Sequence, residues 1–302
     1  MKKINWAEIL CEDAQFPVSQ VISKKSKLFS KSDCQSIIKK AVVESLKEIY
    51  KKEQFEETGA LYSIRVEIID DIVSIYLDTT GESLNKRGYR ELNGVAPIRE
   101  TLAAAFVYLS WWGKDNRILL DPLCGTATIL IEGAMIAKNI APGKNRSFVS
   151  ENWPVVPEEV WKSNRDKLEG LENINAKPII YGSDKDKEVL DIAWHNINLA
   201  GVADCIELQE CELKNIELKK GNGVIITNPP YGERLFERKQ VEDLYKEMGE
   251  VFRNQFPDWS YFIITPDVLF EKTFGKKANK NRKLYNGGIK CYLYQYFGKL
   301  SR

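Results

Sequence analysis

The stretch Gly223-Val-Ile-Ile-Thr-Asn-Pro-Pro-Tyr-Gly-Glu-Arg-Leu235 joins a short apolar run to two consecutive prolines and a tyrosine. The run Gly223–Thr227 has the length and composition of a buried strand. Neither proline can donate a backbone N–H to a β-ladder, so the strand ends abruptly there. Asn-Pro and Pro-Tyr-Gly are ordinary turn sequences. The same arrangement would also hold a polar acceptor and an aromatic ring rigidly at the edge of a sheet.

From about residue 97 onward, apolar runs alternate with helical patterns. Strands are predicted at 117–121, 178–183, 205–209, 224–227 and 261–265. Helices are predicted at 97–109, with Pro97 as the first helical residue, and at 128–138, 187–200 and 240–256. This alternation indicates crossover connections and a mostly parallel sheet. Two last strands, 283–285 and 289–297, flank Asn-Gly-Gly, which predicts an antiparallel hairpin. The expected class is therefore α/β, with a seven-stranded sheet.

The first 80 residues resemble a small α+β unit. Ser32–Gln35 fits a capping box, followed by a helix to about Tyr50 with apolar residues at helical spacing. Two strand-like runs, 61–69 and 72–78, are separated by a pair of aspartates that predicts a hairpin turn. We therefore expect one domain over residues 1–80, a linker over 81–96 and a second domain over 97–302. Residues 139–177 form an irregular insertion in the second domain.

Composition narrows the class of protein. No segment approaches the ~20 apolar residues of a membrane span, and the N-terminus lacks the apolar core of a signal peptide. A cytoplasmic location is therefore expected. The six cysteines are scattered without a Cys-x-x-Cys pair, and His195 is the only histidine. This pattern predicts free thiols, no metal site and no mechanism that pairs a histidine base with a nucleophile.

Basic residues are unevenly distributed in a chain whose net charge is only +1. Nine lysines lie between Ser19 and Lys52 against three acids, and a second cluster lies between Lys276 and Lys283. Clusters of this kind are most often solvated surfaces. Two of them in a nearly neutral protein also suit a polyanionic partner, because phosphate contacts supply most of the nonspecific affinity for nucleic acid.

Polar groups follow the predicted strands at their carboxyl ends, where open α/β sheets bind ligands. Asp121 ends the first strand, and Asp184 ends the second, where an acid can accept hydrogen bonds from a ribose diol. The turn Gly125–Thr128 contains one glycine, and Asp184 lies about 60 residues beyond it rather than ~20, so a dinucleotide site is disfavoured. Asp121 would repel a phosphate and would suit a cation, such as the ammonium of an amino acid attached to adenosine.

Three motifs in this order resemble those of the class I S-adenosylmethionine-dependent methyltransferases: Asp121-Pro-Leu-Cys-Gly-Thr-Ala-Thr128, Gly182-Ser-Asp-Lys-Asp186 and Asn228-Pro-Pro-Tyr-Gly-Glu-Arg234. More narrowly, the chain resembles the bacterial THUMP-domain RNA methyltransferases that make N2-methylguanine in large-subunit ribosomal RNA. The segments that also match that family's pattern are Arg87–Arg90, Ala96–Glu100, Ala141–Arg146 and Arg282–Asn286.

The resemblance implies a Rossmann-like methyltransferase domain behind a THUMP-like domain, with S-adenosylmethionine as cofactor, no metal, and RNA as partner. The catalytic residues it implies are Asn228, Pro229 and Tyr231. The cofactor-binding residues it implies are Asp121, Cys124, Gly125, Thr126, Asp184, Asp186, Glu212 and Asn228. Cys124 also fits loop packing, Asp186 also fits helix capping, and Glu212 also fits an exposed loop acid. The RNA-binding residues expected from the basic clusters and motifs are Lys24, Lys25, Lys27, Arg87, Arg90, Lys276, Lys277 and Arg282.

Two departures from the family pattern bear on these expectations. The family usually has Gly-Ser-Gly-Thr where this chain has Gly125–Thr128, so Ala127 is expected to need a negative φ, and its methyl group to weaken cofactor binding. The chain also begins where the family's THUMP region is already under way, which predicts a missing N-terminal half.

The implied reaction is methylation of the guanine N2 amine, with 23S ribosomal RNA as the first choice of substrate. Four alternatives remain open: transfer RNA as the substrate, methylation of adenine in DNA, methylation of a protein glutamine, and RNA binding with a degenerate cofactor pocket.

Overall fold

The computed structural model describes residues 4–91, 98–113, 117–218, 221–231 and 235–299. Within these ranges the chain forms two compact units. One comprises Met1–Leu84 with Arg146–Lys167, and the other comprises Asn85–Asn145 with Leu168–Arg302. Each unit has its own apolar core.

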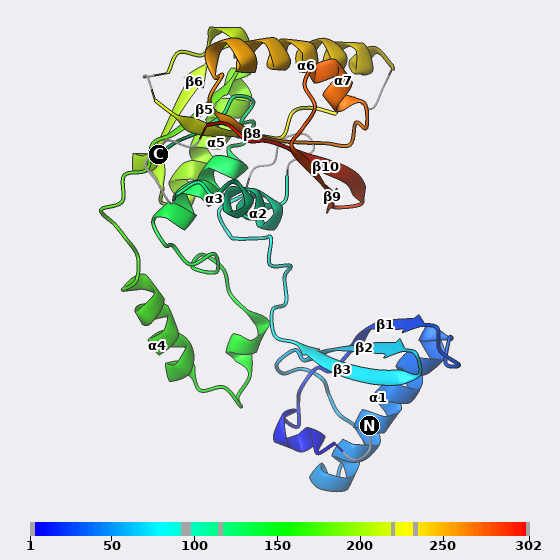
Figure 1. The fold of residues 1–302 in the computed structure, drawn as a ribbon. Helices are drawn as coiled ribbons and strands as arrows, with labels where there is room; N and C mark the ends of the chain where they lie inside the picture. Colours follow the sequence, from blue (N-terminus) through cyan, green and yellow to red (C-terminus); the bar gives the residue numbers. More distant parts are fainter. Residues whose placement is uncertain (1–3, 92–97, 114–116, 219–220, 232–234, 300–302) are drawn as a thin grey trace. The chain divides into compact units, whose positions relative to one another are not determined.

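The larger unit contains a seven-stranded sheet in the order β6-β5-β4-β7-β8-β10-β9. Figure 1 shows this sheet between two layers of helices. Its strands are β4 (Ile118–Asp121), β5 (Ile180–Asp184), β6 (Ile206–Glu210), β7 (Gly223–Thr227), β8 (Ser260–Thr265), β9 (Lys280–Asn286) and β10 (Ile289–Tyr296). Strands β4 to β8 pair in parallel, whereas β10 pairs antiparallel with both β8 and β9. The predicted parallel sheet closed by an antiparallel hairpin is confirmed.

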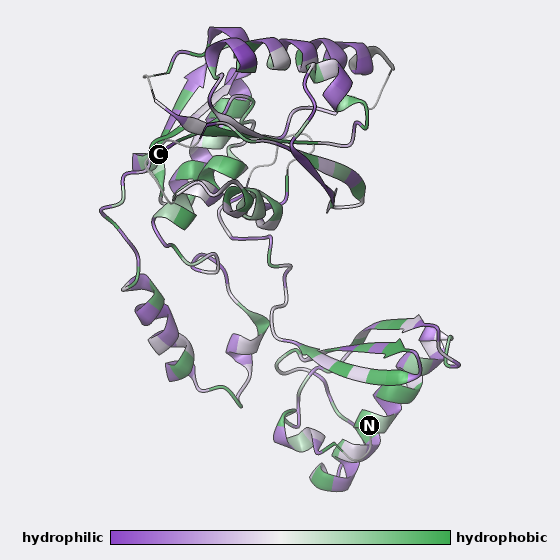
Figure 2. Ribbon diagram, viewed as in Figure 1, coloured by the Kyte–Doolittle hydropathy of each residue, from purple (hydrophilic) through white to green (hydrophobic). Residues whose placement is uncertain are grey.

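Helices cover both faces of this sheet. They are α2 (Glu100–Ser110), α3 (Thr128–Ala137), α5 (Lys187–Leu199), α6 (Leu235–Gln255) and α7 (Phe270–Phe274). Helices α2, α3 and α5 pack in one apolar cluster on the first face, and α6 and α7 pack in another on the second face. Figure 2 shows hydrophobic residues along the strands between these layers. Every residue of β4 and β7 is buried, as expected of parallel strands covered on both sides.

Two helix starts differ from the sequence predictions. Helix α2 begins at Glu100, because Arg99 has extended backbone angles and occupies the N-cap position. Pro97, expected as its first residue, lies outside the described residues. Helix α6 begins at Leu235, five residues earlier than predicted. The residues in between are mostly good helix formers, so nothing in the sequence marks residue 240 as a start.

The smaller unit contains a three-stranded sheet in the order β1-β2-β3. Its elements are β1 (Val18–Lys24), α1 (Lys31–Tyr50), β2 (Ser63–Ile69) and β3 (Ile72–Asp78). Strand β1, absent from the prediction, pairs in parallel with β2 through the crossover helix α1. The predicted hairpin of β2 and β3 is confirmed, and Asp70 and Asp71 in its turn have left-handed φ values of 48° and 63°.

The predicted capping box of α1 is wrong. The N-cap is Ser30, whose hydroxyl oxygen accepts the backbone N–H of Asp33 at 3.4 Å. The side chain of Gln35 instead donates to the carbonyl of Val18 on β1. The helix therefore starts one residue before Ser32, and Gln35 joins the helix to the sheet.

The insertion contains more regular structure than the sequence predicted, including helix α4 (Glu158–Glu169) and a 3-10 turn over Val149–Asn152. Helix α4 has no buried residue, and only three of its twelve residues are apolar, so little in its sequence marks it as part of a core. Residues 146–167 group with the N-terminal unit. Trp153 accounts for part of this grouping, because its ring stacks on Tyr62 at 4.4 Å between centroids and its Nε1–H donates to the carbonyl of Leu61 at 2.9 Å.

No helix in the ranges that the structure describes combines the length and the apolar character needed to cross a membrane.

Replacing Trp153 by alanine should destabilise the smaller unit. The ring is 6% exposed, so its loss leaves a cavity in that unit's core and should lower the free energy of unfolding by about 3–5 kcal/mol. Urea unfolding followed by circular dichroism measures this change. Trp111→Ala is the control, since Trp111 is 63% exposed and should change stability by less than about 1 kcal/mol. Equal effects of the two substitutions would contradict the assignment of the insertion to this core.

Candidate active site at the carboxyl edge of the sheet

The carboxyl ends of β5, β4 and β7 lie next to one another because these strands are neighbours in the sheet. They carry Asp184, Asp121 and Asn228, respectively. A direct contact joins the first two ends: the backbone N–H of Gly125, in the loop after β4, donates to Oδ2 of Asp184 at 3.1 Å. The topology therefore brings together the three groups that the sequence placed at strand ends.

Asp121 is buried, with only 2% of its surface exposed. Burial raises the pKa of its carboxyl to about 7, and the negative charge of Asp184 adds to this rise. The hydroxyl of Thr227 and the backbone N–H of Leu123, at 3.2 Å, act in the opposite direction. Near neutral pH this carboxyl is thus balanced between its two forms, and a nearby cation would favour the ionised one.

The loop between β4 and α3 has two residues with left-handed backbone. Gly125 has φ of 51°, and a Cβ added to it would meet no atom within 4 Å, so its backbone faces open space. Ala127 has φ of 63°, so the condition of a negative φ, under which an alanine was expected to be tolerated, is not met. Its methyl group is fully buried in the apolar cluster of α2, α3 and α5. The methyl group thus points into the core. The left-handed backbone of Ala127 lowers the stability of the folded state by about 1–2 kcal/mol.

Cys124 and Thr126 lie in the same loop and are both 7% exposed. Burial raises the pKa of the Cys124 thiol, with further contributions from Asp121 and Asp184. A buried, protonated thiol is a packing group rather than a nucleophile.

Asp184 and Asp186 use their carboxylates differently. Asp184 accepts the N–H of Asp186 with Oδ1 at 3.1 Å, in addition to that of Gly125 with Oδ2. Asp186 is the N-cap of α5, where Oδ1 accepts the N–H groups of Glu188 at 3.0 Å and Val189 at 3.3 Å. The helix-capping interpretation of Asp186 is thus seen in the structure, while its cofactor contact stays a prediction.

Glu212 follows β6 and is exposed. Its carboxylate pairs with Lys214 at 2.7 Å, and this contact lowers the pKa of Glu212. A contact between Glu212 and a cofactor stays a prediction.

The turn after β7 holds Asn228 half-buried and Pro229 buried. The Tyr231 hydroxyl donates to Oδ1 of Asn228 at 2.5 Å. Burial raises the pKa of Tyr231 well above its usual value, so this hydroxyl keeps its proton. The Tyr245 hydroxyl on α6 donates to the Pro230 carbonyl at 3.3 Å. Gly232, Glu233 and Arg234 of the motif lie outside the described residues.

Two further residues reach this turn from the C-terminal hairpin. The Sγ atom of Cys291 on β10 lies 4.0 Å from the Tyr231 hydroxyl oxygen. Asn286, at the end of β9, is 8% exposed, interacts with the same hydroxyl, and accepts the backbone N–H of Arg99 at 3.3 Å. Sequence reasoning did not select either residue for the site. The match of Arg282–Asn286 to the family pattern was the signal that pointed toward Asn286.

Arg87 and Arg90 differ from their expected role as RNA contacts. Each guanidinium side chain is only 10% exposed and pairs with a buried carboxylate, Glu132 at 3.3 Å for Arg87 and Glu100 at 3.1 Å for Arg90. Arg90 also donates to the Thr128 hydroxyl at the start of α3. These arginines attach residues 87–90 to helices α2 and α3 through Glu132 and Glu100. Both glutamates are buried, and a buried carboxylate without a cationic partner would destabilise the fold.

The lysines expected to contact RNA are all exposed, as is Arg282. In the smaller unit they lie at the end of β1 and in the loop that follows it. In the larger unit they follow α7 and continue into β9. Exposure agrees with a solvated surface and with a phosphate-binding surface, so their role stays a prediction.

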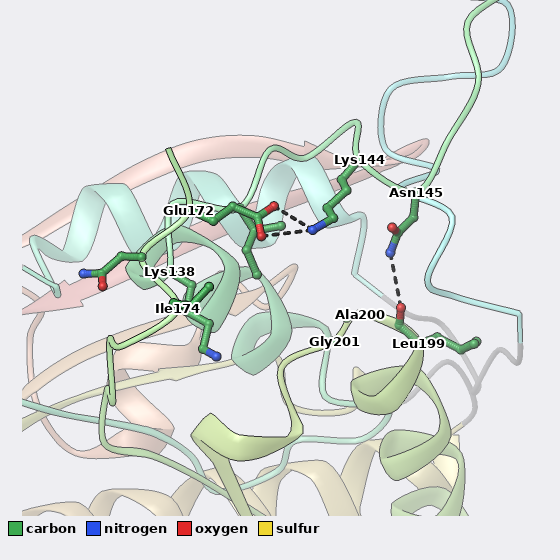
Figure 3. A pocket seen from close by; sticks show the side chains of 10 residues that line it. Lys138, Lys144, Asn145, Glu172, Ile174, Leu199, Ala200 and Gly201 are labelled. Atoms are coloured by element: carbon green, nitrogen blue, oxygen red, sulfur yellow. Dashed lines mark hydrogen bonds and ion pairs between the residues drawn. The ribbon is translucent and has the colours of Figure 1, made fainter. Parts of the chain in front are cut away.

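A cavity of about 200 Å³ is lined by Lys138, Glu172 and Gly201, among others (Figure 3). Its residues follow α3 and α5 or precede β5, so it lies toward the amino ends of the strands, away from Asn228. Lys144 there is paired with Glu172 at 2.8 Å. In the described ranges, no group of three or more histidine, cysteine or acidic side chains is placed to hold a metal ion.

Residues 87–295 match the family model described as RMKL-like, methyltransferase domain, and residues 1–78 match the THUMP domain. The chain belongs to this methyltransferase family. It is 45% identical over 301 residues to the Bacillus subtilis protein YpsC, named as a candidate RNA methyltransferase, covering 99% of this chain and 77% of that protein. The expected Rossmann-like methyltransferase domain and THUMP domain are confirmed.

Two other relatives add detail. The chain is 39% identical over 234 residues to the ribosomal RNA large subunit methyltransferase K/L of Psychromonas ingrahamii, covering 75% of this chain but only 31% of that protein. The crystal structure of SMU.472, a candidate methyltransferase complexed with SAH, has a TM-score of 0.90 and 41% identity, covering 100% of this chain and 79% of the other. The predicted class, an S-adenosylmethionine-dependent methyltransferase, is thereby confirmed at the level of the family.

The residues of the methyltransferase site fit this cofactor. The buried carboxylate of Asp121 would suit the ammonium group, and the oxygens of Asp184 would suit a ribose diol, and both contacts stay predictions. The open space beside Gly125 lets backbone approach a ligand without a side chain in between.

Binding of S-adenosylhomocysteine should strengthen as pH rises through 7. Asp121 has its pKa raised to about 7 in the free protein, and the ligand's ammonium favours the ionised form. Binding therefore releases a proton at low pH, and affinity should be about tenfold weaker at pH 6 than at pH 8. Calorimetric titration at both pH values measures this ratio. Asp121→Asn is the control, because its side chain is neutral throughout and should remove the tenfold dependence. The same ratio in both proteins would contradict the role of Asp121.

Proposed function

We propose that the chain transfers a methyl group from S-adenosylmethionine to the exocyclic N2 amine of a guanine in RNA, with 23S ribosomal RNA as the first candidate. The observation that carries this proposal is the position of Asn228 and Pro229 at the end of β7, beside the strand ends that carry Asp121 and Asp184. The names of the relatives support RNA as the substrate. The chain spans 31% of the Psychromonas protein, so that protein's substrate supports the choice of ribosomal RNA only by analogy.

The acceptor amine is a poor nucleophile because its lone pair is delocalised into the ring. The side-chain oxygen of Asn228 and the carbonyl of Pro229 accept its two N–H groups, which favours a tetrahedral nitrogen and directs the lone pair. The two prolines fix the backbone, so these acceptors need no rearrangement when the base arrives. When bound, the cofactor supplies an electrophilic methyl group on a sulfonium, and the nitrogen later loses one proton to solvent.

The Tyr231 hydroxyl occupies one of these acceptors in the present structure. Arrival of the base exchanges one donor for another at Asn228: the exocyclic N–H takes the place of the tyrosine O–H. Tyr231 is then free to stack its ring on the base, which contributes roughly 1–3 kcal/mol. Extrusion of the base costs a few kcal/mol, so stacking offsets a substantial part of that cost.

The cofactor residues hold and orient the donor. Asp184 and the Gly125 backbone define one side of the site, and Asp121 holds the ammonium end. Correct alignment of donor and acceptor lowers the activation barrier by roughly 7–11 kcal/mol in favourable cases. Positioning is therefore the main contribution of this chain to the rate.

Other flat amines fit the same acceptors, including adenine in DNA and a glutamine side chain. The THUMP domain favours RNA over both. Identification of the methylated product separates these substrates, and mapping of the modified nucleotide separates ribosomal from transfer RNA.

Asn228→Ala should abolish transfer while leaving cofactor binding nearly unchanged. Loss of a preorganised acceptor is expected to lower kcat by at least about 100-fold, whereas the affinity for S-adenosylhomocysteine should change less than about threefold. The assay uses labelled S-adenosylmethionine and undermethylated ribosomal RNA, followed by nucleoside analysis for N2-methylguanine. Asn222→Ala, just before β7 at its amino end, is the matched control and should retain activity. Absence of transfer to any RNA by the unaltered protein would overturn the proposal, and an equal loss of binding and transfer would assign Asn228 a structural role.

A further inference from the structure

In the C-terminal hairpin of β9 and β10, lysines and tyrosines alternate on one face, both along each strand and across the pair. Strands β9 and β10 pair antiparallel, with Tyr285 opposite Lys290 and Lys283 opposite Tyr292. Residues directly opposite in an antiparallel pair project from the same face, as do residues two apart in one strand. The four side chains therefore form one patch, the Lys/Tyr quartet.

The contacts within the quartet position its rings and charges. The Lys283 Nζ lies 5.8 Å from the Tyr285 ring centroid, and the Lys290 Nζ lies 5.3 Å from that of Tyr292. Tyr285 is 59% exposed, and both lysines are exposed. Cation–π contacts at such sites contribute only about 0.5–1 kcal/mol. They orient an exposed ring but do not account for its exposure.

The surroundings of the quartet are strongly basic. From Lys272 to Lys290 the sequence contains seven lysines and arginines and no acid, although the whole chain has a net charge of +1. Neither β9 nor β10 contains a carboxylate to pair with the lysines. Charge complementarity therefore favours a polyanion as the occupant of this surface.

The opposite face of the same hairpin reaches the catalytic turn. Asn286, next in sequence to Tyr285, interacts with the Tyr231 hydroxyl, and Cys291, next to Lys290, lies 4.0 Å from it. Neighbouring residues in a strand are 3.8 Å apart at Cα and point to opposite faces. The quartet is thus separated from the acceptor site by the thickness of one hairpin.

Lysines on an edge strand such as β9 also discourage pairing between the edges of two sheets. That explanation accounts for Lys283 on β9. It does not apply to Lys290, which lies on the inner strand β10, and it leaves the exposed ring of Tyr285 unexplained.

We propose that the Lys/Tyr quartet binds single-stranded RNA next to the target nucleotide, with Tyr285 stacking on a base and Lys283 and Lys290 contacting phosphates. A basic track with interspersed aromatic rings is the usual surface for single strands, whereas a duplex keeps the faces of its bases stacked inside. An acidic peptide would use the lysines without needing the ring. This proposal rests on the proposed function, because the target base enters at Asn228.

Binding of a fluorescein-labelled 12-nucleotide single-stranded RNA tests the assignment. Tyr285→Ala should weaken binding by about five- to one-hundred-fold, and Tyr285→Phe should restore it, because stacking needs the ring only. The double substitution Lys283→Ala with Lys290→Ala should weaken binding. It should also make the negative slope of log affinity against log salt shallower by about 1.4, which corresponds to two phosphates. In methyl transfer to ribosomal RNA, these variants should raise KM with little change in kcat. The matched controls Tyr108→Ala and Lys299→Ala should behave as the unaltered protein, since both side chains are exposed outside the quartet.

Unchanged affinity for S-adenosylhomocysteine in each variant verifies that the fold is intact. If the protein methylates RNA and the quartet variants keep normal affinity and KM, the quartet proposal is overturned and the proposed function stands. If the lysine variants lose binding but Tyr285→Ala does not, or if the duplex form of the RNA binds equally well, the surface is a general polyanion contact and the proposal is likewise overturned. If no RNA is methylated but the variants still weaken RNA binding, the proposed function fails and the RNA surface stands.

Discussion

The carboxylate of Asp184 is the interaction on which the site depends. Its two oxygens accept the backbone N–H groups of Gly125 and Asp186, which joins the loop after β4 to the loop after β5. The hydrogen bond from Gly125 is part-buried and links the two loops directly, whereas the one from Asp186 is exposed and shapes the loop after β5 alone. Burial raises the pKa of Asp121 on the adjacent strand to about 7, and the charge of Asp184 adds to this rise. Asp184 thus contacts one neighbouring loop and influences the charge of the next strand end.

The turn that carries Asn228 differs from the loops around Asp184, because the side-chain oxygen of Asn228 accepts a hydrogen bond from a side chain that a substrate amine could replace. The prolines fix Asn228, and the Tyr231 hydroxyl satisfies its side-chain oxygen at 2.5 Å. Cys291 and Asn286 reach that hydroxyl from the C-terminal hairpin. The turn after β7 and the hairpin are therefore in contact, as the proposed binding of flanking RNA on the outer face of the hairpin requires.

The sequence predicted the larger sheet because its parallel strands are covered on both faces and read as continuous apolar runs. It predicted Asp121, Asp184 and Asn228 as neighbours because parallel strands end at one edge. Strand β1 was missed since serine and glutamine interrupt its apolar residues, and α4 was missed since it buries nothing. The interactions of Asn286 and Arg87 depend on contacts between distant segments. Charge alone could not distinguish an arginine that binds a buried glutamate from one that meets a phosphate.

Calorimetric titration with S-adenosylhomocysteine measures how far cofactor affinity depends on Asp184. In Asp184→Ala the affinity should fall at least about tenfold, because both the diol acceptor and the hydrogen bond to the Gly125 loop are lost. Asp184→Asn, which keeps one acceptor oxygen, should retain more affinity, and Asp191→Ala, on the exposed side of α5, should change nothing. Affinity in Asp184→Ala equal to that of the unaltered protein would contradict the account.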